Sequence, residues 1–276
     1  MGKGKNVTSD TVAPTGRAPI ARAILITGAT GGIGAELAYH YAAPGRTLVL
    51  WGRNPQRLAD IAARSTTRGA KVFTRQIDLR DGDAALAAFE EDDAAHALDL
   101  VILGAGLSDI QGPDDMTEDP GKVLGLALVN YATPIALATA AARGMIKRGG
   151  GQIALIGSVA GSYELPFAAS YSSSKSGLAF FAKAAGLSWR QHGVFVTLIA
   201  PGFVDTPMSQ RLEGPRPFLV SAKGAARRIA RAIARKQRDY TFPWPFKVLE
   251  VLVRLVPGRL RERILLKLAV GQKDRA

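Results

Sequence analysis

The sequence contains no cysteine, only three histidines and few aromatic residues. Without cysteine there is no disulfide framework, no thiolate nucleophile and no thiolate metal site. His40, His96 and His192 lie far apart and form no His-x-x-x-His pair, so we expect no metal site. Aromatic residues make up 7% of the chain, whereas 47% is hydrophobic overall. A large core built mainly from aliphatic side chains is therefore expected.

Long hydrophobic runs are also missing. No stretch approaches the 18 apolar residues that would predict a membrane span. Residues 1–21 are polar, lack the apolar centre of a signal peptide, and are predicted to be a disordered lead-in. Asn6 stands where a myristoylation motif requires serine or threonine. These features predict a cytoplasmic protein.

Positive charge is unevenly distributed along the chain. The formal net charge is +13, but residues 223–275 hold fifteen Lys or Arg against four acidic residues. The remainder is therefore nearly neutral, and we expect no nucleic-acid partner for the protein as a whole. The basic C-terminal part requires an explanation of its own.

Short apolar runs alternate with helical patterns from residue 22 to residue 242. The predicted strands are residues 23–27, 47–51, 71–77, 98–103, 152–156, 194–199 and 239–242. The predicted helices are residues 32–43, 55–68, 83–95, 120–148, 170–191 and 222–236. Strands that are continuously apolar indicate a parallel sheet covered on both faces. The pattern predicts the α/β class, as a single Rossmann-like domain with a doubly wound parallel sheet of about seven strands.

A glycine-rich turn follows the first predicted strand. Gly28, Gly32 and Gly34 have GxxxGxG spacing and open the next helix. Such a turn lets the backbone approach a pyrophosphate, and the helix N-terminus supplies N–H donors. The alternative is an ordinary glycine-rich connection, which the strand–turn–helix context makes less favoured.

The end of the second predicted strand carries Arg53 and no acidic residue. An acid there would bind a ribose 2′-hydroxyl and favour NAD, whereas Arg53 is placed to meet the 2′-phosphate of NADP. A surface arginine is the alternative. Asp78, after the third strand, could accept from an adenine amino group, cap a helix, or be a solvated charge.

Tyr171 and Lys175 share one face of a predicted helix at i, i+4 spacing. A tyrosine has a pKa of about 10, which a neighbouring ammonium lowers, so Tyr171 could act as an acid or base. Ser158 ends the preceding strand and could donate to a substrate oxygen. A Tyr-x-x-x-Lys pair by itself also arises by chance.

In combination, these features resemble the classical short-chain dehydrogenase/reductase family over roughly residues 22–245. The matching positions are Thr27, Gly28, Gly32, Gly34, Asp78, Ala105, Gly106, Asn130, Ser158, Tyr171, Lys175, Pro201, Gly202, Val204 and Thr206. The resemblance implies Tyr171 as general acid/base, Lys175 as the residue that binds the nicotinamide ribose and lowers the tyrosine pKa, and Ser158 as the residue that orients the substrate. It further implies that Asn130 supports a proton relay through water.

The resemblance also implies a set of cofactor contacts. They are Gly28, Thr30, Gly32, Ile33, Gly34, Arg53, Asp78, Leu79, Ala105, Gly106, Tyr171, Lys175, Pro201, Gly202, Val204 and Thr206. Two positions depart from the family pattern. Leu103-Gly104-Ala105-Gly106 replaces the usual Asn-Asn-Ala-Gly, and Gly31 stands where many NADP users have Arg or Lys. The prediction that NADP(H) is preferred over NAD(H) therefore depends on Arg53.

Residues 203–222 are predicted to form a mobile lid over the substrate. Leu107, Val159, Leu165, Pro166 and Phe203 suggest a partly apolar pocket, and Glu164 either adds a charge or faces solvent. The expected substrate is a small carbonyl or alcohol whose identity no residue indicates.

Residues 243–276 form a basic extension beyond the core, with apolar helices that carry cationic residues expected at 247–256 and 259–268. They could pack on their own domain or on a partner subunit, and residues 243–270 could lie on a membrane surface. Nucleic-acid binding by this extension is a third alternative. We also expect a homo-oligomer, either a dimer or a tetramer.

The sequence thus predicts an NADP(H)-dependent oxidoreductase that interconverts a carbonyl and an alcohol. The alternative is a catalytically silent NADP(H)-binding regulator or scaffold. That alternative is weakened because the Asn, Ser, Tyr and Lys positions are all filled.

Overall fold

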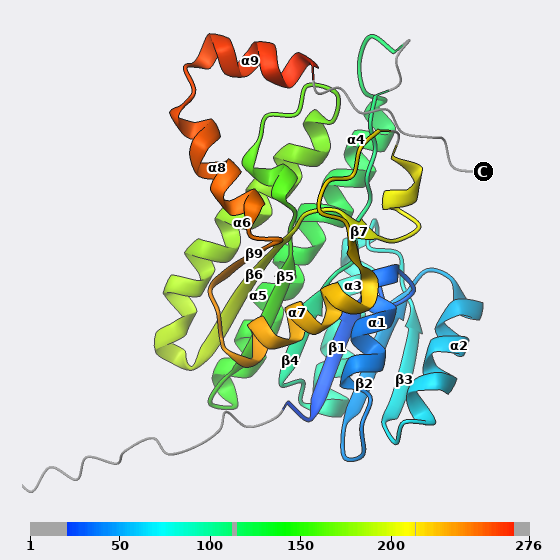
Figure 1. Cartoon of the computed structure of the whole chain (residues 1–276). Helices are drawn as coiled ribbons and strands as arrows, with labels where there is room; N and C mark the ends of the chain where they lie inside the picture. The colour runs from blue at the N-terminus through cyan, green and yellow to red at the C-terminus, as the bar shows by residue number, and fades with distance from the viewer. Residues whose placement is uncertain (1–20, 112–114, 213, 268–276) are drawn as a thin grey trace, which may run out of the picture.

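The computed structural model describes residues 21–111, 115–212 and 214–267. Its centre is a seven-stranded parallel sheet in the order β3-β2-β1-β4-β5-β6-β9 (Figure 1). The strands are β1 (Ala23–Thr27), β2 (Thr47–Gly52), β3 (Lys71–Gln76), β4 (Leu100–Leu103), β5 (Gly151–Ile156), β6 (Val194–Pro201) and β9 (Asp239–Phe242). The predicted Rossmann-like single domain is confirmed.

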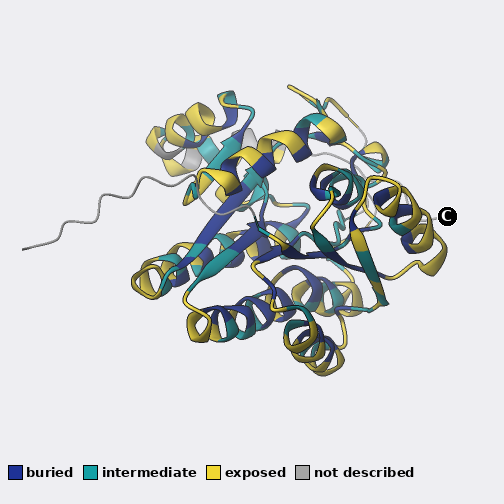
Figure 2. Cartoon of the chain, turned by 90° about the horizontal axis from the view of Figure 1, so that it is seen from below, coloured by how far each residue is buried: buried dark blue, intermediate teal, exposed yellow. Residues whose placement is uncertain are grey.

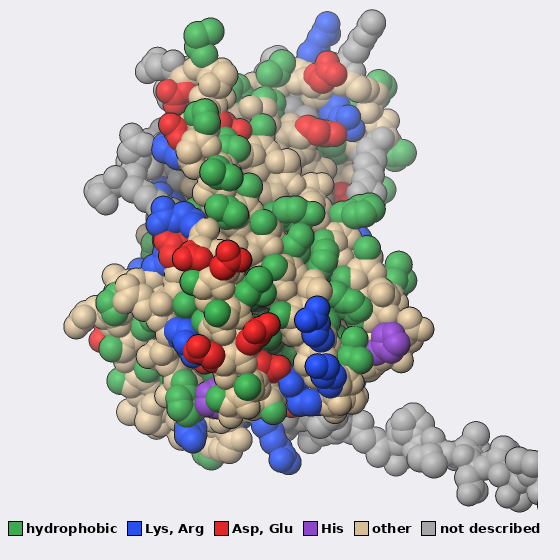
Figure 3. All heavy atoms as spheres, turned by 180° about the vertical axis from the view of Figure 1, so that it is seen from behind, with side chains coloured by type: hydrophobic (Ala, Val, Ile, Leu, Met, Phe, Trp, Pro, Cys, Tyr) green, Lys and Arg blue, Asp and Glu red, His purple; other side chains and the backbone are tan. Residues whose placement is uncertain are grey.

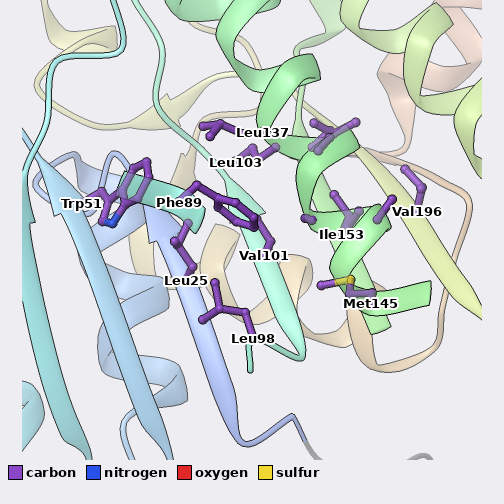
Figure 4. Packing of buried hydrophobic residues seen from close by; sticks show 14 of the residues in the cluster. Leu25, Trp51, Phe89, Leu98, Val101, Leu103, Leu137, Met145, Ile153 and Val196 are labelled. Carbon is purple, nitrogen blue, oxygen red and sulfur yellow. The ribbon is translucent and has the colours of Figure 1, made fainter. Parts of the chain in front are cut away.

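Helices cover both faces of this sheet, and each face has its own core. On one face lie α1 (Gly32–Tyr41), α2 (Pro55–Thr66) and α7 (Ala222–Ala234); on the other lie α3 (Gly82–His96), α5 (Thr133–Lys147) and α6 (Ala169–Trp189). The helices turn their buried sides toward the sheet (Figure 2). Trp51, Phe89 and Leu137 are among the side chains that fill the second core (Figure 4). The predicted aliphatic core is thus divided between two layers.

The order of the strands reverses between β1 and β4, which are neighbours in the sheet. In an open α/β sheet, the connections from two such strands leave in opposite directions, so a crevice opens at their carboxyl ends. The glycine turn follows β1, and Gly104-Ala105-Gly106 follows β4. The topology therefore brings both segments to the crevice.

The helix predicted over residues 120–148 is interrupted. It consists of α4 (Pro120–Ala127), a π-helical turn (Leu128–Ala132) and α5, and the Thr133 N–H donates to the carbonyl of Leu128. Pro134 has no N–H to give to the carbonyl of Asn130 four residues earlier, so a regular α-helix cannot continue through this point. π turns of this kind are frequent at functional sites.

The same stretch, Pro120–Lys147, is long and apolar enough to cross a membrane, although no membrane span was predicted from the sequence. It packs instead as a core helix: Leu137, Ala141 and Met145 of α5 are buried against the sheet. Length and composition by themselves are weak support for a membrane span.

The segment predicted as a lid contains regular structure. β7 (Val204–Asp205) and β8 (Val220–Ser221) pair in parallel, and a 3₁₀ turn spans Ser209–Arg211. Beyond β9, the two expected C-terminal helices are α8 (Pro245–Leu255) and α9 (Gly258–Lys267). They lie together at one end of the molecule (Figure 1). The predicted disorder of residues 1–21 concerns a segment almost wholly outside the described residues.

Candidate active site

The glycine turn is packed so closely that side chains are excluded from it. Gly28 has φ +70°, and a Cβ atom there would lie 2.7 Å from the Cα of Ala105. A Cβ on Gly32 would lie 2.6 Å from the Thr206 methyl group, and one on Gly34 would clash with the carbonyl oxygen of Gly28. The bare backbone at the start of α1 is thus exposed to the crevice, as a pyrophosphate site requires.

One cleft of about 900 Å³ collects the predicted cofactor residues. All sixteen line it, from Gly28 at the glycine turn to Thr206 at the start of the lid. Ser158 lines the same cleft, whereas Asn130 is fully buried behind it. Residues from six parts of the chain are therefore brought together as the sequence pattern predicts.

The predicted catalytic pair, Tyr171 and Lys175, lies on α6 at the wall of this cleft. Burial raises the pKa of the Tyr171 phenol, and a hydrogen bond with Ser158 opposes that shift. Burial lowers the pKa of Lys175 to about 8, and its ammonium group donates to the carbonyl of Ile156 at 3.0 Å. Lys175 Nζ lies 6.0 Å from the centre of the Tyr171 ring.

The direction of the tyrosine shift differs from the expectation. The resemblance implies that Lys175 lowers the pKa of Tyr171, yet in this structure the pKa is raised. Burial removes the phenolate from water, and this destabilises the phenolate more than the hydrogen bond with Ser158 stabilises it. The phenol is consequently held in its protonated form, able to donate a proton.

Asn130 shapes the loop that follows β4. Its side-chain oxygen accepts from the Leu107 N–H at 2.8 Å, and its amide nitrogen donates to the Leu107 carbonyl at 2.9 Å and to Ser174 Oγ at 3.3 Å. A Cβ on Gly106 would lie 3.4 Å from Asn130 Oδ1 and 3.5 Å from Lys175 Nζ. Asn130 thus stands close to Lys175, and its side chain is engaged with Leu107; the water relay stays a prediction.

The far end of the cleft is cationic. Arg53 lines it as predicted, and Arg57 joins it from the first turn of α2. Asn54 caps that helix by accepting from the Arg57 N–H at 2.9 Å. Sequence analysis missed Arg57, although its position four residues after Arg53 was a usable signal.

Asp78 also lines this end, but its carboxylate is paired with Arg80, whose Nε donates to it at 3.0 Å. The hydrogen bonds from Arg80 hold the pKa of Asp78 below its usual value, and the charge of Arg53 adds to the effect. The helix cap of α3 is Asp81 rather than Asp78. An adenine contact of Asp78 stays a prediction.

The substrate side is apolar, as expected, but its lining is partly different. Leu107, Val159, Leu165 and Phe203 line the cleft, whereas Pro166 does not. Phe246 of α8 and Tyr163 line it as well, and neither was predicted. Glu164 is paired with Arg261 of α9 at 3.4 Å, outside the cleft.

Within the described residues, no three His, Asp or Glu side chains gather in a way that could hold a metal ion. Hydroxyl, ammonium and guanidinium groups line the cleft, among them those of Tyr171, Lys175 and Arg53.

Comparison with known proteins assigns the family. The model of the short chain dehydrogenase family matches residues 22–216. Dehydrogenase/reductase SDR family member 7B of Bos taurus is 33% identical, over 85% of this chain and 78% of its own length. An uncharacterized oxidoreductase of Myxococcus xanthus is 30% identical, over 87% of this chain and 94% of its own length.

Solved structures agree with this assignment. A short-chain dehydrogenase from Sphingobium yanoikuyae in complex with NADPH has a TM-score of 0.73 and 25% identity, covering 86% of this chain and 97% of its own. A metagenomic short-chain oxidoreductase in complex with NADP has a TM-score of 0.68 and 28% identity, covering 80% and 96%. The chain therefore belongs to the short-chain dehydrogenase/reductase family and is an NAD(P)-dependent oxidoreductase.

Proposed function

We propose that the protein interconverts a carbonyl compound and an alcohol, that Tyr171 is its general acid/base, and that it prefers NADP(H). The observation that carries the proposal is the Tyr171 phenol, half-buried and hydrogen-bonded to Ser158 in the same cleft as the glycine turn. When bound, the nicotinamide supplies or accepts the hydride.

The residues of the chain provide the proton and the orientation. In reduction, Tyr171 and Ser158 donate hydrogen bonds to the substrate oxygen, and Tyr171 transfers its proton as negative charge develops there. A phenol with a raised pKa is suited to this acid role. In oxidation Tyr171 acts as the base and must first lose its proton, so we expect oxidation to be favoured at higher pH.

Replacing Tyr171 with phenylalanine tests this assignment. The variant keeps the ring and loses the proton donor, so kcat for ketone reduction should fall by about 10²–10⁴. Fluorescence titration should show unchanged NADPH affinity, and circular dichroism an unchanged fold. Undiminished turnover would remove Tyr171 from the mechanism.

If the wild-type protein binds NADPH but turns over no ketone in a broad panel, the alternative of a catalytically silent regulator is favoured.

The NADP(H) preference is supported by two cations, Arg53 and Arg57, at the adenosine end of the cleft. Neither shows a carboxylate ion pair among the described residues, so both are available to a 2′-phosphate. Related structures contain NADPH, NADP or NAD, so the proposed preference depends on Arg53 and Arg57 of this chain.

Replacing both arginines with alanine should abolish the preference. Hydrogen bonds to a charged group are worth about 1.5–3 kcal/mol each. The ratio of kcat/KM with NADPH to that with NADH should therefore fall by at least tenfold. Arg64→Ala is the matched control, because Arg64 lies over the Tyr39 ring at the other end of α2. A wild-type protein that uses both cofactors equally would contradict the proposal.

We further propose that the protein is a homo-oligomer, through the outer surface of α4, α5 and α6. Leu124 is 63% exposed, Phe180 78% and Leu187 66%. Figure 3 shows the side of the molecule where α3 and α5 lie, with hydrophobic side chains between clusters of charge. Large exposed apolar side chains on adjacent helices are typical of an interface between subunits.

A cytoplasmic location, with peripheral membrane contact through residues 243–270, is also proposed. Half of the sixteen large hydrophobic side chains that are exposed in the described residues lie between Trp244 and Leu266. That concentration favours contact with another surface over packing on the domain alone.

A further inference from the structure

Helix α8 has its apolar side turned away from the protein. Trp244 and Leu255 are 74% and 77% exposed, and Val248, Val251 and Leu252 are also exposed. Their spacing of three or four residues places them on one side of the helix. We call these five residues the α8 face. Phe246 and Glu250, on the other side, are buried. The usual pattern of a surface helix, with its apolar stripe toward the core, is largely reversed.

The burial of Phe246, together with ionic contacts, fixes the helices in this orientation. Lys247 Nζ lies 3.1 Å from the Glu250 carboxylate and 3.9 Å from Asp239 of β9. Arg261 of α9 pairs with Glu164, which follows the 3₁₀ turn after Ser158. Turning the α8 face inward would break these contacts and carry Phe246, which is now buried, out into water. The outward orientation is therefore a stable property of the fold.

The same helix forms a wall of the substrate cleft. The ring of Phe246 lies against Gly202, 6.2 Å from the Phe203 ring and 5.8 Å from the Phe218 ring. Phe218 and its neighbour Leu219, on the lid, are 58% and 44% exposed. Apolar side chains thus run from Phe246, on the inner side of α8, through the lid to the apolar side of the cleft.

The charge of this region indicates what covers it. Residues 243–267 contain six Lys or Arg and two acidic residues. In a two-fold contact between copies, the same surface patches meet, so these positive charges would face one another. An anionic lipid surface is complementary to them, and it also accepts the apolar side chains and the exposed Trp244.

We propose that the α8 face docks on an anionic lipid surface and that the cleft takes its substrate from that surface. The substrate class is then a carbonyl compound or alcohol apolar enough to partition into a bilayer. This inference rests on the proposed oxidoreductase function, and it adds the source and the class of the substrate.

Co-sedimentation of the full-length protein with vesicles tests the docking. Vesicles of equal parts phosphatidylglycerol and phosphatidylcholine should bind the wild-type protein, and binding should weaken as salt screens the charges. The double variant Val251→Glu/Leu255→Glu should bind at least tenfold more weakly. Ala59→Glu/Ala63→Glu, at two exposed positions of α2, makes the same change of charge, so it is the control and should bind like the wild type. Equal binding by the double variant and the wild type would overturn the proposal.

Kinetics separate this inference from the proposed function. With NADPH, a water-soluble ketone such as cyclohexanone should be reduced equally by the wild type, the double variant and the control. The long-chain ketone 2-tridecanone, supplied in the anionic vesicles, should be reduced at least tenfold more slowly by the double variant than by the wild type.

Failure of the wild type to reduce any soluble ketone would count against the proposed function, while co-sedimentation would still report on docking. Loss of self-association in the double variant, with no vesicle binding by the wild type, would assign the α8 face to a second copy and overturn the lipid proposal.

Discussion

At the scale of single residues, the buried ammonium group of Lys175 lowers the stability of the folded protein. Its ammonium group is buried and has one hydrogen bond within the described residues, to the Ile156 carbonyl. Burial lowers its pKa to about 8, below the value of about 10.4 in an unfolded chain. Below pH 8 both states carry the charge, so the folded protein bears the whole cost of burying it. As pH rises from 8 toward 10, the folded state loses its proton first and that cost is relieved.

Lys175→Met should therefore make the protein more stable at neutral pH while it inactivates the enzyme. The relief of burial should increase the free energy of unfolding by about 2–3 kcal/mol at pH 7. Urea unfolding at pH 7 and at pH 10 measures this, with a smaller difference between variant and wild type at pH 10. A destabilised variant at pH 7 would mean that the ammonium group contributes net stability.

At the scale of elements, one buried carboxylate joins two strands to a helix. Asp92 of α3 accepts from the Trp51 indole N–H of β2 at 2.8 Å and pairs with Arg75 of β3 at 2.7 Å. Trp51 is 1% exposed, so its N–H has no access to water. This contact holds α3 against the edge of the sheet that carries Arg53 at its carboxyl end.

Asp92→Ala should consequently destabilise the protein more than its neighbour Glu91→Ala does. Loss of Asp92 leaves a buried donor unsatisfied and removes an ion pair, which together cost about 2–4 kcal/mol. Glu91 also pairs with Arg75, at 2.9 Å, but its side chain is 67% exposed, so its loss should cost at most about 1 kcal/mol. Thermal or urea unfolding of the two variants gives the comparison, and equal losses would show that the Trp51 contact adds nothing.

At the scale of the whole molecule, two separate surfaces carry exposed apolar side chains. One is the outer surface of α4, α5 and α6, and the other is the α8 face. The first is proposed to bind further copies of the chain and the second a lipid surface. Because the surfaces are distinct, a change in one should leave the function of the other intact.

Phe180→Glu should dissociate the oligomer. A charge placed at the centre of an apolar contact between subunits is strongly unfavourable, so light scattering after size exclusion should show a shift from dimer or tetramer to monomer. The Val251→Glu/Leu255→Glu variant should keep the wild-type mass. A monomeric wild-type protein, or an unchanged mass for Phe180→Glu, would count against the proposed interface.

What the sequence alone determined about this protein depends on local patterns. Continuous apolar runs predicted the five inner strands of the sheet. The GxxxGxG spacing predicted a turn without side chains after β1, and the i, i+4 spacing placed Tyr171 and Lys175 on one face of α6. Such features involve residues close in the chain, or a topology that alternating strands and helices impose. All sixteen predicted cofactor residues accordingly line one cleft.

The tertiary structure alone decided the rest. Phe246 reaches the cleft because α8 folds back over the end of the sheet, a contact between distant segments that no local pattern encodes. The raised pKa of Tyr171 and the lowered pKa of Lys175 follow from burial, which depends on everything packed around them. The outward orientation of the α8 face is likewise decided by the rest of the molecule, which covers Phe246 and Glu250 on the other side of the helix. A helix's sequence shows which side is apolar but not which side the rest of the molecule covers.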